Sequence, residues 1–97
     1  MKVQNMTNAN GNKVANQFII TDQDMDYDYE VFQSYSTTIV QRTVGLRTGV
    51  VEVNLDRDYW DYSVTTSKYR NQFLGETKKE TQAKIDSGEY ILADLNG

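Results

Sequence analysis

The chain has 97 residues, a net charge of −4, seven tyrosines and one tryptophan, and it contains neither cysteine nor histidine. This length fits one small domain, which leaves little room for a deep internal pocket. Without cysteine and histidine the chain can form no disulfide, no thiolate or imidazole metal site and no histidine-based catalytic dyad. We therefore expect a non-enzymatic protein that needs no cofactor or metal ion and acts through its surface.

The first residues lack the apolar run of a secretory signal, and no later segment is long and apolar enough for a membrane span. We therefore expect a cytoplasmic protein without membrane contacts. Residues 1–13 are polar and rich in asparagine, and they are expected to form a flexible lead-in.

The amino-terminal half is typical of a β-sheet. Residues 14–21 are rich in β-branched and aromatic side chains and predict a strand. Residues 31–44 predict a second, long strand, although residues 34–38 could instead begin a short helix. Two glycines then mark a turn, and residues 50–55 predict a third strand.

The carboxy-terminal half carries two helix signals. Thr65 or Thr66 can cap a first helix, which would end at Gly75 because glycine tolerates a left-handed cap. A capping box at residues 77–80 predicts a second short helix that ends at Gly88.

The apolar tail, residues 89–95, is expected to pack on the core or to add an edge strand. Strands followed by helices indicate the α+β class. We expect a three-stranded antiparallel sheet from the amino-terminal half, packed by two short carboxy-terminal helices, with residues 14–97 as a single compact domain.

An acidic, tyrosine-containing segment between β-rich regions accounts for the net negative charge. Five of the 14 acids lie within nine residues, so the rest of the chain has nine acids against ten bases. The spacing begins like a calcium loop, but Tyr27 and Gln33 stand where that loop needs glycine and a bidentate glutamate. We expect an exposed hairpin loop that is either merely solubilising or binds a basic partner by imitating phosphate spacing. Its candidate binding residues are Asp22, Asp24, Asp26, Tyr27, Asp28, Tyr29 and Glu30.

An aromatic and basic segment follows, with six bases against four acids between residues 57 and 84. Trp60 and Tyr62 could stack on the bases of a single-stranded nucleic acid while Lys68 and Arg70 contact its phosphates. The alternative is that the aromatic side chains belong to the core and the basic ones only face solvent.

The pattern WDYSxTTxxYxxxFL, at residues 60–74, also carries a resemblance. Together with residues 16–21 and 32–35 it resembles small uncharacterised proteins of tailed bacteriophages and gut bacteria, over about residues 14–95. The resemblance implies a viral or prophage setting, and it carries over no functional residue.

Small acidic phage proteins without catalytic residues often block a host protein. The leading expectation is therefore an inhibitor of a basic host protein, for example a CRISPR or restriction nuclease, that acts through the acidic segment. A single-stranded nucleic-acid-binding accessory protein and a virion structural or assembly protein are the alternatives. The sequence leaves the partner, the host and the oligomeric state open.

Overall fold

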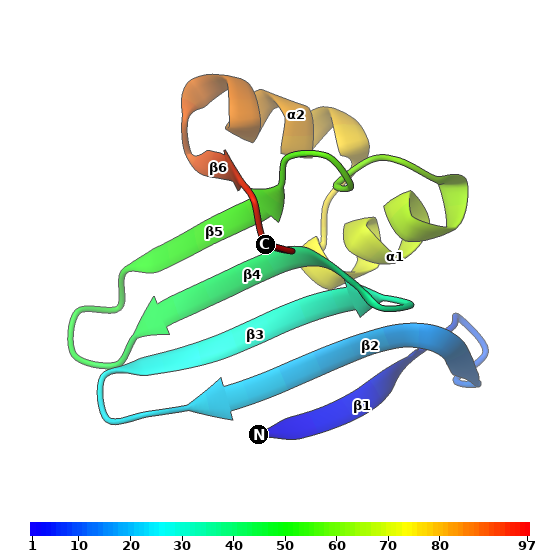
Figure 1. Cartoon of the computed structure of the whole chain (residues 1–97), viewed down its shortest axis with the longest axis horizontal. Coiled ribbons are helices and arrows are strands. Elements are labelled where there is room, and N and C mark those ends of the chain that lie inside the picture. Colours follow the sequence, from blue (N-terminus) through cyan, green and yellow to red (C-terminus); the bar gives the residue numbers. More distant parts are fainter.

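The computed structural model describes all 97 residues and contains six strands and two helices. The strands form one sheet in chain order, and every neighbouring pair is antiparallel except β5 and β6, which run parallel. The two helices fill the crossover between β5 and β6 (Figure 1). The elements are β1 (Lys2–Thr7), β2 (Lys13–Gln23), β3 (Tyr27–Ser34), β4 (Thr37–Gly45), β5 (Val51–Asp56), α1 (Val64–Leu74), α2 (Lys78–Ser87) and β6 (Tyr90–Ala93).

The α+β class is correct, but the expected three-stranded antiparallel sheet is wrong, because the sheet has six strands and is mixed. One reason is that residues 31–44 are two strands, β3 and β4, rather than one. The turn between them is made by Tyr35 and Ser36, and Tyr35 has a φ of +56°. A tyrosine is uncommon in the left-handed region, where glycine or asparagine is usual. Because neither is present here, the sequence gives no signal of a turn.

The other two additional strands are the two edges of the sheet. Residues expected to be a flexible lead-in form β1, which pairs with β2 and buries Met6 at 3% exposure. An edge strand needs little apolar character, because it gains backbone hydrogen bonds on one side and keeps the other in solvent. The tail forms β6, which confirms the second of its two expected roles, that of an edge strand.

Both expected helices are confirmed, with one shifted boundary. The N-cap of α1 is Ser63, whose hydroxyl accepts a hydrogen bond from the Thr66 backbone amide at 3.1 Å. Thr66 itself is buried, and its hydroxyl lies 3.1 Å from that of Ser34 in β3. Helix α1 ends at Gly75 with a φ of +70°, and α2 opens with the expected capping box. Neither helix is long and apolar enough to cross a bilayer.

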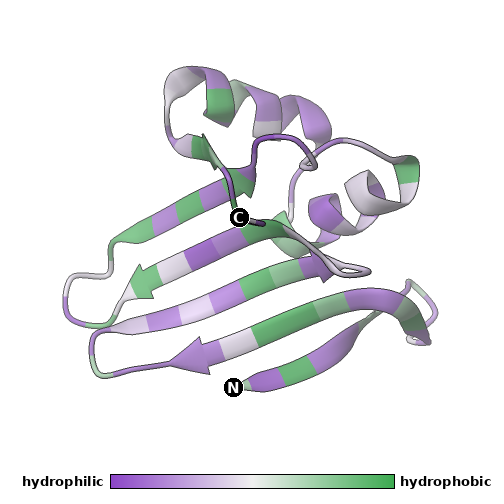
Figure 2. Cartoon of the chain, in the orientation of Figure 1, coloured by the Kyte–Doolittle hydropathy of each residue, from purple (hydrophilic) through white to green (hydrophobic).

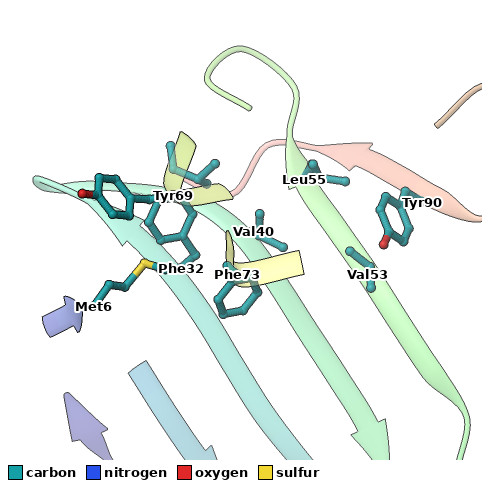
Figure 3. Packing of buried hydrophobic residues seen from close by; sticks show 9 residues of the cluster. Met6, Phe32, Val40, Val53, Leu55, Tyr69, Phe73 and Tyr90 are labelled. Carbon is teal, nitrogen blue, oxygen red and sulfur yellow. The ribbon is translucent and has the colours of Figure 1, made fainter. Parts of the chain in front are cut away.

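Both helices cover the same face of the sheet. The ring of Phe73 in α1 stacks on that of Phe32 in β3, with centroids 6.0 Å apart (Figure 3). Tyr90, whose ring lies beside Lys84 of α2, is the register partner of Val53 on this face. The buried apolar core consists of Met6, Phe32, Ile39, Val40, Val53, Leu55, Tyr69, Phe73 and Tyr90.

The helices leave part of the sheet uncovered. They gather at one end, whereas the β2–β3 and β4–β5 hairpins project together at the opposite end (Figure 1). The second face of the sheet carries no helix at all. We call this second face, which includes Ile20 and Val31, the open face.

Candidate functional site

The acidic segment forms the β2–β3 hairpin, and its turn is built by Asp24. One carboxylate oxygen of Asp24 accepts hydrogen bonds from the backbone amides of Asp26 and Tyr27, both at 2.8 Å. The other oxygen accepts a hydrogen bond from the Tyr29 hydroxyl, also at 2.8 Å. These hydrogen bonds hold the pKa of Asp24 below its usual range, and the bond from the Asp26 amide contributes most. The carboxylate of Asp24 in turn raises the pKa of Tyr29. Asp24 is therefore occupied with shaping the turn.

Most of the remaining acids of the segment also have partners. Glu30 forms an ion pair with Arg42 at 3.1 Å, and Asp22 lies 3.5 Å from the amino terminus. Asp28 accepts a hydrogen bond at 2.6 Å from a glutamine amide across the hairpin. Asp26 alone has a carboxylate with no hydrogen bond or ion pair, so its charge is free for a partner.

The β4–β5 hairpin lies directly beside the acidic one, and the Leu46 amide donates a hydrogen bond to the Asp26 carbonyl at 2.8 Å. Large apolar side chains stand in solvent here, with Met25 exposed by 83% and Val50 by 65%. Apolar colour reaches the end of β4 and the start of β5 in Figure 2. We call this group the hairpin tip: Met25, Asp26, Tyr27, Leu46 and Val50.

The sequence identified two of the five residues of the hairpin tip, Asp26 and Tyr27. It did not identify Met25, nor Leu46 and Val50, which belong to a turn about twenty residues further along the chain. A leucine between two turn glycines was the only available signal, since turns normally carry polar side chains.

The aromatic and basic segment is arranged very differently, because Arg70 is fully buried. One terminal nitrogen of its guanidinium donates hydrogen bonds to the Trp60 carbonyl at 2.6 Å and to Asp61 at 3.1 Å. The other donates to the Asn71 side chain at 2.9 Å. The guanidinium also lies 5.0 Å from the centre of the Trp60 ring. Arg70 thus serves the interior, where no phosphate can reach it.

Asp61 is the anion that balances this buried charge. Burial alone would raise its pKa, but hydrogen bonds from Lys78, Ser67 and Arg70 outweigh burial and lower the pKa of Asp61 to about 2. The Lys78 ammonium lies 2.6 Å from its second oxygen. We call Trp60, Asp61, Ser67, Arg70 and Lys78 the Arg70 cluster.

Only two of the four residues considered for nucleic-acid binding stand at the surface. Tyr62 packs edge-on against Tyr59, with ring centroids 5.3 Å apart, and both residues are partly exposed, Tyr59 by 41% and Tyr62 by 48%. The Lys68 ammonium lies 5.4 Å from the centre of the Tyr69 ring. Both residues border a shallow hollow beside the first turn of α1.

No group of three or more carboxylates converges in a way that could hold a metal ion. No curated protein and no solved structure matches the chain. Residues 1–89 match the model of a family of unknown function (DUF8033).

Proposed function

The chain belongs to the DUF8033 family, and we propose that it is a non-enzymatic binding protein that engages a basic partner protein through the hairpin tip. In this proposal the partner is a host protein of a phage-infected cell, and binding inhibits it. A CRISPR or restriction nuclease is the class of target that the proposal favours, because such enzymes carry basic grooves for nucleic acid.

The observation that supports this proposal most is the exposure of the apolar side chains at the hairpin tip. Met25 is 83% exposed and Leu46 44%, and neither side chain belongs to the buried core. Clustered exposed apolar side chains are typical of interaction sites, and methionine and tyrosine are enriched there. Their burial against a partner would supply affinity.

The acids beside these side chains would supply selectivity. Asp26 has no partner of its own, and the rest of the segment adds further negative charge around it. Opposite charges steer association and are screened by salt, so binding to a basic surface should weaken as ionic strength rises.

The two alternatives have less support. A nucleic-acid-binding face would have to rely on Tyr62 and Lys68, because Arg70 is buried and paired. A role in the virion has no structural feature that favours it, and detection of the chain in purified particles would test it.

The experiment is capture of the partner from host lysate by the tagged protein, beside a variant with Met25→Ser and Leu46→Ser. We expect one basic protein to be retained by the parent chain, to elute with salt and to be missing with the variant. A Lys68→Ala variant is the control and should capture the protein like the parent. Equal capture by all three chains would contradict a role for the hairpin tip.

A further inference from the structure

The open face of the sheet carries an apolar stripe that no element of the fold covers. The register places six residues in one row across it, Val3, Ile20, Val31, Gln41, Asn54 and Ile91. Three apolar members of this row are adjacent, on β1, β2 and β3, and Phe18 lies next to Ile20 on the same face. Val3 is 53% exposed although it lies in a strand. The apolar part of the open face is thus three strands wide at the row of Ile20 and continues on β2 to Phe18, which lies between Asn5 and Gln33.

This stripe continues into the hairpin tip. Tyr29 shares the open face with Val31, and its ring lies 6.0 Å from that of Tyr27 at the tip. Both tyrosines lie on the side of the sheet that the helices leave free. A partner held at the hairpin tip can therefore extend along the open face without a break.

The charged side chains of the open face are acidic, and the one cation beside them is the amino terminus, which lies 3.5 Å from Asp22. Next to the apolar row the register aligns Asp22, Tyr29, Thr43 and Glu52. These aligned rows contain two acids and no lysine or arginine, since Lys2 and Arg42 alternate to the other face. A second copy of the chain would bring the same acids to the interface, and its one nearby cation, the amino terminus, already has Asp22 as its partner, so Glu52 would meet no lysine or arginine.

We infer that the open face is the docking surface for an amphipathic helix of the partner, with an apolar stripe flanked by lysine and arginine; this inference rests on the proposed function. Three strands span about 10 Å, which matches the diameter of an α-helix. Phe18 and Ile20 of β2, followed by Val31, Tyr29 and Tyr27 of β3, extend along the strands for about 20 Å, enough for a helix of about 14 residues. The helix would cover Phe18, Ile20 and Val31 and place its bases near Asp22 and Glu52.

The test uses two matched double variants. Ile20→Thr with Val31→Thr removes apolar surface from the open face and keeps β-branched side chains in the strands. Val44→Thr with Val51→Thr makes the same chemical change in a register pair on the other face. Thermal unfolding shows whether both variants fold.

The first probe is a fluorescent synthetic helix with a leucine stripe and lysine flanks, compared with a scrambled sequence and with a glutamate-flanked version. We expect the lysine-flanked helix alone to bind, and the open-face variant to weaken that binding at least tenfold while the other variant leaves it unchanged. Equal binding by both variants, or binding of the glutamate-flanked helix, would overturn the inference. A parent chain that sediments as a dimer, and an open-face variant that is monomeric, would overturn it in favour of self-association.

The second probe is the protein captured through the hairpin tip. The tip variant is Met25→Ser with Leu46→Ser, and the open-face variant is Ile20→Thr with Val31→Thr. If neither variant captures this protein, the inference is supported. Loss with the tip variant alone overturns the inference and leaves the proposed function standing. Capture that neither variant changes overturns both.

Discussion

The acidic segment that contributes to the hairpin tip and the segment that carries the Arg70 cluster both combine charged and aromatic residues, yet the fold uses them in opposite ways. In the Arg70 cluster the guanidinium is buried and every strong charge has a partner, so the residues hold α1 to the preceding loop. At the hairpin tip Met25 and Leu46 stand in solvent beside the unpaired carboxylate of Asp26. Similar composition therefore serves stability in one region and leaves a free surface in the other.

The largest effect on this contrast is expected when the guanidinium at the centre of the Arg70 cluster is removed. Arg70→Ala should lower the free energy of unfolding by about 3–5 kcal/mol, because it opens a cavity and leaves the Trp60 carbonyl without its donor. Urea unfolding measures the change. Lys68→Ala, two residues earlier on the exposed side of α1, should cost less than about 0.5 kcal/mol. Equal effects of the two substitutions would show that Arg70 is no structural residue.

Acid should weaken the same cluster by a smaller amount. The pKa of Asp61 is about 2 in the folded chain, against an ordinary value of 3.8 for an aspartate in an unfolded chain. A lowered pKa contributes stability that is present above pH 4 and is lost as the pH falls toward 2, here about 2 kcal/mol.

Unfolding of the parent and of Asp61→Asn between pH 5 and pH 2 isolates this contribution. The pKa of Glu76 is also lowered, because hydrogen bonds from Lys84 and its neighbours outweigh the effect of burial, but Glu76 titrates in both chains. The difference in stability between the two chains should therefore shrink as the pH falls. A constant difference would contradict the role of Asp61.

Within the acidic hairpin the comparison can be made between two neighbouring aspartates. Asp24→Ala should lower the melting temperature, because three hydrogen bonds to its carboxylate are lost, whereas Asp26→Ala should leave it unchanged. Thermal unfolding followed by circular dichroism distinguishes them. If Asp26→Ala destabilised the chain as much as Asp24→Ala, the carboxylate of Asp26 would not be free.

Local signals in the sequence were sufficient for the helices but not for the sheet. The capping box at Thr77 and the terminal Gly75 act within a few residues, so they can be read without knowledge of the fold. The turn at Tyr35 depends instead on strand pairing that overrides the preference of its residue type. Strand β1 is held by pairing and by Met6, neither of which is visible in a polar segment.

For the candidate sites, the property that the sequence could not predict was the burial of individual side chains. The sequence shows that Trp60 lies shortly before the helix that carries Arg70, but it does not show that the guanidinium is enclosed. Likewise, it identifies Tyr27 and Asp26 as candidates but not the Leu46 turn that lies beside them across the sheet. Contacts between distant hairpins are set by register, which requires the whole sheet.

The most direct test of the distinction between the two regions is amide hydrogen exchange of the chain alone and in complex with its captured partner. We expect partner binding to slow exchange in residues 24–28 and 45–51, around the hairpin tip, and to leave residues 60–71 of the Arg70 cluster unchanged. Added protection confined to residues 60–71 would contradict the assignment, because it would place the binding surface on the region that the fold uses for its own stability.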